Sequence, residues 1–201
     1  MQKAIHMSHE AGEDLIEGIR SGNSRAFVRL YDDYFFSMTY YTNGITGNWF
    51  EAENITADTF EKVWLMRTNF ARFPDLMAFI YVTCRNSAYN YLRATHNKNK
   101  KEVPAGDFHL LSLEDLAADE VDEETEKAII EVELLRKLHA EINLLTPKRR
   151  QILELYMQGL DMAQIAAEMG LSEEAVRNAK FKALKKLQKK LKDHPLLLLF
   201  I

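Results

Sequence analysis

The chain has 201 residues, of which 26 are Lys or Arg and 30 are Asp or Glu, for a formal net charge of −4. This length allows one ordinary domain or two small ones, and an apolar content of 47% excludes a chain that is disordered throughout. Because only 8 Gly and 4 Pro supply turns, an all-β sandwich is excluded too, and we expect an all-α fold.

Residues 1–101 are predicted to form a bundle of four helices. Apolar residues recur there at helical spacing, which marks one buried stripe on each of the first three helices. The stripes are Leu15, Ile16 and Ile19, then Phe27, Leu30, Tyr31, Tyr34 and Phe35, then Ile55, Thr59, Val63 and Met66. Breaks are predicted at 22–24 and 43–48, and the fourth helix is predicted to run from Phe73 to about Arg93.

The fourth predicted helix carries a mixture of aromatic, amide and guanidinium side chains. Such a mixture stacks on unpaired bases, reads their edges and neutralises the backbone, which is typical of single-stranded DNA binding. The side chains are Tyr81, Arg85, Asn86, Tyr89, Asn90 and Arg93. Core packing is the alternative for each tyrosine, and the spacing alone leaves both interpretations open.

Residues 102–135 hold 12 acidic residues and one basic residue. A segment this acidic repels itself and has little to bury, so we expect an acidic flexible linker between two folded domains. A sharper alternative is that the segment mimics nucleic acid and covers a basic face of its own protein until a partner arrives.

Residues 136–201 are predicted to form a domain of short helices and carry 13 basic and 7 acidic residues. One helix is predicted at 147–158, a second from 161 to 170, and a long third one from 172 to about 192, after a three-residue turn. The boundary signals are Thr146 as N-cap, Pro147 at the first helical position, Gly159 as a helix end, Asp161 with Gln164 as a capping box, Gly170 at positive φ, and Ser172 as N-cap.

The last two of these helices match a DNA-binding helix-turn-helix, in which a small residue, a turn glycine and apolar inner faces let the helices cross closely. The matching residues are Ile165, Ala166, Met169, Gly170, Leu171 and Val176. Residues 177–192 of the final helix carry eight basic side chains and no acidic one, which favours phosphate binding over a merely solvated face.

The start of that final helix is expected to face base edges, because the N-terminal part of a recognition helix enters the major groove. The candidates for base contact are Glu174, Arg177, Asn178 and Phe181, and those for phosphate contact are Lys182, Lys185 and Lys186.

The single cysteine, Cys84, cannot form an internal disulfide, and no secretory leader opens the chain. The apolar run 196–201 is far shorter than the roughly 18 to 20 residues that cross a bilayer. We therefore expect a cytoplasmic protein with no membrane insertion of its own, whose apolar end docks on a neighbouring helix or is poorly ordered.

The chain resembles extracytoplasmic-function (ECF) sigma factors of bacterial RNA polymerase, in the sigma-70 superfamily. Residues 145–191, with Ile165-Ala166, 175–178 and 183–187, resemble the promoter-binding domain of that family. In the N-terminal part, Leu30-Tyr31 and Tyr34 resemble the first conserved region of the family. The polymerase-binding helix is resembled by residues 52–55, Phe60 and Val63-Trp64. The promoter-melting helix is resembled by residues 84–86 and 90–93. Together these motifs span residues 14–98 and 136–192, in the family's order.

The resemblance implies a sigma region 2-like domain at 1–101, an acidic linker at 102–135 and a sigma region 4-like domain at 136–201. Its function would be to direct RNA polymerase core to promoter DNA and open it, with no cofactor and with an anti-sigma factor as a further partner. Core-polymerase binding is expected at Glu53, Asp58, Phe60 and Trp64, and binding of the proximal promoter element at Arg85, Asn86, Tyr89, Asn90 and Arg93. The chain departs from the usual family pattern at Asn54, Ala57 and Asn90.

Two other classes of function were weighed. An enzyme is disfavoured because the six histidines are scattered and the chain has no Cys pair, no Gly-rich phosphate loop and no nucleophile elbow, so we expect neither metal nor catalytic residues. A stand-alone helix-turn-helix regulator remains the alternative, although such proteins present two recognition helices to two half-sites and no dimerisation heptad is visible here.

Overall fold

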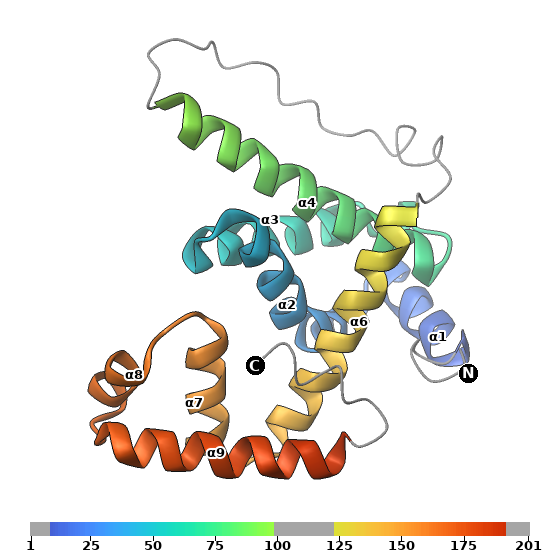
Figure 1. Cartoon of the computed structure of the whole chain (residues 1–201). Coiled ribbons are helices and arrows are strands. Elements are labelled where there is room, and N and C mark those ends of the chain that lie inside the picture. Colours follow the sequence, from blue (N-terminus) through green and yellow to red (C-terminus); the bar gives the residue numbers. More distant parts are fainter. Residues whose placement is uncertain (1–8, 99–122, 192–201) are drawn as a thin grey trace. The chain divides into compact units, whose positions relative to one another are not determined.

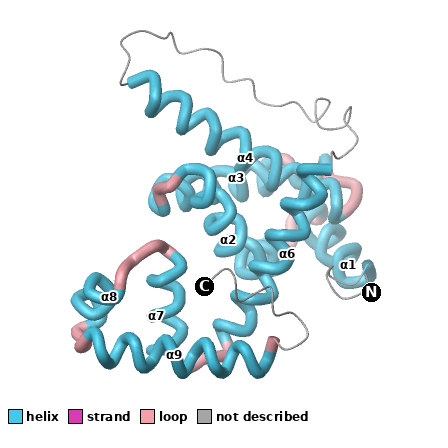
Figure 2. The backbone as a smooth tube through the Cα atoms, in the orientation of Figure 1, coloured by secondary structure: helices cyan, strands magenta, loops and turns pink. Residues whose placement is uncertain are grey.

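The computed structural model describes residues 9–98 and 123–191, and every regular element in these two stretches is a helix (Figure 2). The all-α prediction is confirmed. The chain divides into two compact units, residues 1–133 and 134–201, whose helices are labelled in Figure 1.

The first unit is a helical bundle around one apolar core, and the four predicted helices are all present. They are α1 (His9–Arg20), α2 (Ser24–Thr46), α3 (Trp49–Leu65) and α4 (Phe73–Lys98), with the short 3-10 helix η1 (Arg67–Asn69) before α4. The core combines the predicted stripes with residues of α4, among them Ile19, Leu30, Tyr34, Val63, Leu76 and Ile80, none of which is exposed. α1 approaches α2 so closely that a Cβ on Gly18 would lie 2.7 Å from the Cβ of Ala26.

The break between α2 and α3 is shorter than predicted. Residues 43–46 continue α2, and the turn consists of Gly47, in the left-handed region at φ 62°, and Asn48, which caps α3. The helix continues through Asn43 and Gly44 because Thr42 and Thr46 on the same helix are buried in the bundle. Tertiary packing here outweighs the weak helix propensity of asparagine and glycine.

Helix α6 (Glu123–Asn143) begins inside the stretch predicted to be a flexible linker. Its residues Ala128 and Val132 are buried, and the buried carboxylate of Glu133 accepts a hydrogen bond of 2.5 Å from the Tyr34 hydroxyl. Residues 123–133 therefore belong to the first unit, which extends beyond the predicted end at residue 101. The acidic composition drew attention away from the helical spacing of Ala128 and Val132, which are four residues apart. Residues 102–122 of the predicted linker lie outside the described residues.

The second unit contains the rest of α6, then α7 (Pro147–Met157), α8 (Met162–Met169) and α9 (Glu173–Lys190). Its core holds Ile152, Leu155, Ile165, Ala166 and Val176. The predicted capping box is present, since Asp161 accepts from the Gln164 amide and the Gln164 side chain accepts from the Asp161 amide. Thr146 stands at the N-cap of α7 as predicted, but its side chain makes no cap hydrogen bond. The apolar end, residues 196–201, lies outside the described residues.

None of the helices in the described parts of the chain is both long and apolar enough to span a bilayer.

Candidate nucleic-acid interface

The crossing of α8 and α9 has the geometry of a helix-turn-helix. Gly170 ends α8 in the left-handed region at φ 62°, and the Leu171 amide donates to the Ala166 carbonyl at 2.9 Å. The Ser172 hydroxyl then accepts from the Ala175 amide at 3.2 Å and starts α9. A side chain with a Cβ strains this backbone conformation, so glycine suits the turn for a physical reason.

The outer face of α9 is a continuous polar and basic surface that is fully accessible. All six predicted contact residues of the distal promoter element are exposed, and they fall in two adjacent rows with a spacing of four residues, namely Glu174, Asn178, Lys182 and Arg177, Phe181, Lys185. Phe181 is 65% exposed, which is unusual for a phenylalanine and leaves its ring available to a partner. Arg177 is held only by an exposed pair with Glu173 at 3.9 Å.

Two other lysines of α9 are turned toward the protein. The Lys180 ammonium lies 2.9 Å from the centroid of the Tyr156 ring, a cation–π contact that ties α9 to α7. Lys186 donates to the Leu144 carbonyl at 3.3 Å, where we had predicted a phosphate contact. Spacing along the helix does not distinguish these two lysines from Lys182 and Lys185, because their contacts come from other helices.

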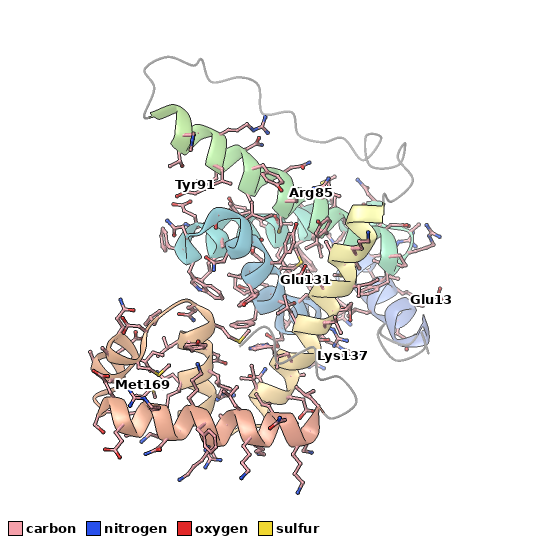
Figure 3. The ribbon with its side chains drawn as sticks, in the orientation of Figure 1. Glu13, Arg85, Tyr91, Glu131, Lys137 and Met169 are labelled. Carbon is pink, nitrogen blue, oxygen red and sulfur yellow. The ribbon has the colours of Figure 1, made fainter. Side chains whose placement is uncertain are left out.

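The predicted single-strand surface lies on α4. Tyr89 is 47% exposed, Asn90 and Arg93 are exposed as well, and Arg85 and Asn86 are half-buried (Figure 3 labels Arg85). The Arg93 guanidinium donates to the Asn90 side-chain oxygen at 2.5 Å. Each of the five predicted residues is thus at least partly accessible on α4.

The open question about the tyrosines of α4 has a different answer at each position. Tyr81 is only 2% exposed and belongs to the core, whereas Tyr89 faces outward. Tyr91 is half-buried, and its hydroxyl accepts from the Asn48 side chain at 3.4 Å, which links α4 to the turn before α3.

The predicted polymerase-binding residues of α3 separate into two groups. Glu53 and Asp58 are exposed and Trp64 is half-buried, so these three residues are accessible; helical spacing places Glu53 and Trp64 on one side of α3 and Asp58 on another. Phe60 is 1% exposed, and its ring packs edge-on against Tyr31 at 5.3 Å and Phe35 at 6.0 Å. Phe60 thus supports the surface from below, and its predicted direct contact with a partner does not fit this burial.

Sequence reasoning missed one residue of this surface, Tyr31 on α2. It was assigned to the buried stripe, yet it is 36% exposed. Partial burial, followed by the negative charges of Glu53 and Asp32, raises the pKa of the Tyr31 hydroxyl. Tyr31 lies at the edge of its stripe, and helical spacing does not reveal how far α3 covers that edge.

Within residues 9–98 and 123–191, no three His, Cys, Asp or Glu side chains lie close enough together to hold a metal ion. Burial raises the pKa of the Cys84 thiol to about 11.

Residues 135–187 match the family model described as "Sigma-70, region 4". The matched segment contains α7, α8 and most of α9, so the second unit is a DNA-binding domain of the sigma-70 class. Over 182 residues the chain is 26% identical to the "ECF RNA polymerase sigma factor BldN" of Streptomyces coelicolor, an alignment that covers 90% of this chain and 66% of the relative. The chain is thus similar to ECF sigma factors over most of its length, and its residues 135–187 match region 4 of the sigma-70 family.

The chain spans about 66% of the length of that curated relative. Among solved structures it is similar to "Structure of CnrH in complex with the cytosolic domain of CnrY", with 20% identity, a TM-score of 0.34, and coverage of 92% of this chain and 99% of that chain.

Proposed function

We propose that this chain is a sigma factor that directs RNA polymerase core to specific promoters and opens them. The observation that carries the proposal is the sigma-70 region 4 match, which falls on a helix-turn-helix whose second helix exposes all six residues predicted to contact the distal promoter element. The surfaces on α3 and α4 supply the two further activities that such a protein needs, docking on polymerase and capture of a melted strand.

In this proposal α9 enters the major groove of the distal promoter element. Arginine pairs with guanine through two hydrogen bonds and asparagine pairs with adenine in the same way, which gives Arg177 and Asn178 the chemistry of base reading. The Phe181 ring would lie against an apolar base edge. Lys182 and Lys185, further along the helix, would bind phosphates and supply salt-dependent affinity.

The first unit binds the proximal element and the polymerase. Along α4, Tyr89 offers a ring on which an unpaired base stacks, Arg85 and Arg93 neutralise phosphates, and Asn86 and Asn90 reach base edges. On α3, Glu53 presents negative charge on the same side of the helix as the Trp64 ring, which suits a basic and apolar patch on polymerase core, and the exposed Asp58 would make a separate contact from another side of the helix.

The chain itself would catalyse no reaction, because the chemistry of RNA synthesis belongs to the polymerase. Because bacterial RNA polymerase works in the cytoplasm, the chain would act there too. It would need no cofactor. An anti-sigma factor that holds the chain inactive is part of this proposal on the strength of the family resemblance.

Co-purification with core polymerase tests the proposal. Wild-type chain should bind core, and Glu53→Arg should bind about tenfold more weakly or worse with an unchanged melting temperature, because reversing an exposed charge affects the interface and spares the core. Glu17→Arg makes the same charge change on the exposed face of α1 and should bind like wild type.

Two results would contradict the proposal. Glu53→Arg could co-purify at the wild-type level, which would remove α3 from the interface. Purified chain could instead bind an inverted repeat tightly without polymerase and fail to bind core, which would favour the stand-alone regulator.

A further inference from the structure

Two tyrosines from different helices form a pair inside the first unit. The hydroxyl of Tyr41, on α2, donates to the hydroxyl of Tyr81, on α4, at 2.8 Å, and the ring centroids are 4.9 Å apart with 46° between the planes. Burial and this hydrogen bond raise the pKa of Tyr41, so its hydroxyl keeps the proton that it donates. The Tyr81 ring is therefore fixed from two sides, by the core and by Tyr41.

The fixed ring lies beneath one of the proposed DNA-binding residues. The guanidinium carbon of Arg85 is 5.5 Å from the centroid of the Tyr81 ring, within the range of a cation–π contact. Arg85 follows Tyr81 by four residues on α4, the spacing at which side chains on one helix face meet. Its positive charge also lowers the pKa of the Tyr41 hydroxyl, against the larger effect of burial.

Holding an arginine in this way matters for capturing a single strand. A free arginine side chain loses rotamer freedom when it binds, and that cost falls when the unbound protein already fixes its orientation. Arg85 is half-buried, in contrast to Arg93, which is exposed and held only by Asn90. Of these two arginines on α4, Arg85 alone stands on a buried platform.

We propose that Tyr41 and Tyr81 are positioning residues that hold the Arg85 guanidinium ready for the unpaired strand of the promoter. The proposal rests on the proposed function, and it makes α2 a contributor to promoter opening, although no α2 residue was predicted to take part. Tyr41 acts only through Tyr81 and Arg85.

The test is a double-mutant cycle on polymerase reconstituted with the full chain. The probe is a promoter that the wild-type holoenzyme selects from a random duplex library. Filter retention of the duplex measures recruitment, and permanganate reactivity of unpaired thymines measures opening. Tyr41→Phe keeps the ring and removes one hydroxyl, and Arg85→Ala removes the positioned group.

We expect Tyr41→Phe to slow opening by about threefold or more, with recruitment and melting temperature close to wild type. In the Arg85→Ala background, Tyr41→Phe should have no further effect, because the group it positions is already absent. Tyr81→Phe removes the same hydrogen bond from its other partner and should match Tyr41→Phe. Tyr156→Phe, an equal hydroxyl deletion in the second unit, should open promoters at the wild-type rate.

The possible results separate three failures. If the effects of Tyr41→Phe and Arg85→Ala multiply, or if Tyr41→Phe lowers recruitment and stability together, the tyrosines have a structural role and the positioning proposal is wrong. If Arg85→Ala opens promoters like wild type, Arg85 does not touch the strand and the proposal falls with it. If the wild-type holoenzyme selects no promoter, the proposed function itself fails.

Discussion

The Cys84 thiol is completely buried in the helical bundle of the first unit. The Sγ atom lies 3.4 Å from the Thr59 hydroxyl, and the hydroxyls of Thr42 and Thr56 also stabilise its charged form. Burial outweighs these hydroxyls and raises the pKa of the thiol from its usual 9.0 to about 11. The thiolate, which is the reactive form, is therefore scarce at neutral pH.

Cys84 should resist alkylation at pH 8 in the native protein and react readily in urea, as mass spectrometry of iodoacetamide-treated samples would report. Because the pKa of the Cys84 thiol is higher in the folded than in the unfolded chain, the protonated thiol contributes to the free energy of unfolding below pH 9. This contribution is lost as the pH rises toward about 11. Cys84→Ala should lack this alkaline loss, so the stability gap between wild type and variant should narrow over that range. Rapid native labelling at pH 8 would show that the thiol is accessible.

Phe60 and Tyr31 show what a sequence pattern tells about single residues and what it leaves out. Resemblance assigned Phe60 to contact with a partner, yet Phe60 is 1% exposed, and spacing assigned Tyr31 to a buried stripe, yet Tyr31 is 36% exposed. Helical spacing fixes the angle between two side chains on one helix. It does not fix how wide an arc the neighbouring helix covers, and that width decides which aromatic ring is buried and which contacts a partner.

At the scale of elements, helix boundaries in the second unit were predictable because they are set by neighbours in sequence. The capping box of Asp161, the left-handed Gly170 and the cap at Ser172 all involve residues within a few positions of one another. Thr146 has an equally suitable side chain but makes no cap hydrogen bond. Residue type therefore predicts where a helix begins better than it predicts which bond is made.

These caps give a matched pair of variants. Asp161→Ala removes the observed capping box and should lower the free energy of unfolding of the second unit by about 0.5 to 2 kcal/mol. Thr146→Ala occupies the same kind of position on α7 without losing a cap bond, so it should change stability by less than about 0.5 kcal/mol. Urea unfolding monitored by circular dichroism measures both, and equal losses would contradict the assignment.

The start of helix α6 was not predicted, because its acidic residues indicated a flexible linker. Acidic residues dominate 123–133, yet Ala128 and Val132 recur at helical spacing and are buried. Charge counting treats every acidic side chain as solvated, whereas the Glu133 carboxylate is buried against Tyr34. The last part of the predicted linker is therefore helical and packs on the first unit. One contact that holds it there joins residues 99 positions apart in the sequence, which no local pattern reveals.

A fragment ending at residue 133 should consequently unfold at higher urea concentration than a fragment ending at 101. The longer fragment keeps Val132 and Glu133 on the core, and burying a valine side chain contributes about 1.5 to 3 kcal/mol. Val132→Asp in the longer fragment should remove this advantage by placing a charge in an apolar site. Equal midpoints for the two fragments would show that 123–133 contributes nothing to the first unit.

At the scale of the whole molecule, the proposed function rests on several weak motifs that occur in a fixed order. A helix-turn-helix alone is shared by many regulators, and the matched family model covers only 135–187. The α3 and α4 motifs in the first unit extend the likeness, in agreement with the 182-residue similarity to a sigma factor. The uneven charge along the chain fits DNA binding by the second unit, since residues 136–201 carry 13 basic and 7 acidic side chains.

In the proposed holoenzyme, α9 reads the distal promoter element. Arg177 stands in the first half of α9, with only an exposed pair to Glu173 at 3.9 Å to release, and a bidentate contact to guanine discriminates by about 1 to 3 kcal/mol. Arg177→Ala should therefore relax preference at one or two base pairs. Lys185, exposed and further along the helix, should contribute to all sequences alike.

Lys185→Ala should thus weaken binding to every promoter by the same factor and reduce the salt slope by about 0.9 for the one phosphate lost. Both variants are measured with core polymerase on a series of single-base promoter changes at two salt concentrations. Lys186→Ala is the matched control, because its ammonium is bound to the Leu144 carbonyl and should change the salt slope less than Lys185→Ala. A uniform loss of affinity across all sequences for Arg177→Ala would mean that Arg177 binds phosphate, and base reading by α9 would then rest on Asn178 and Phe181.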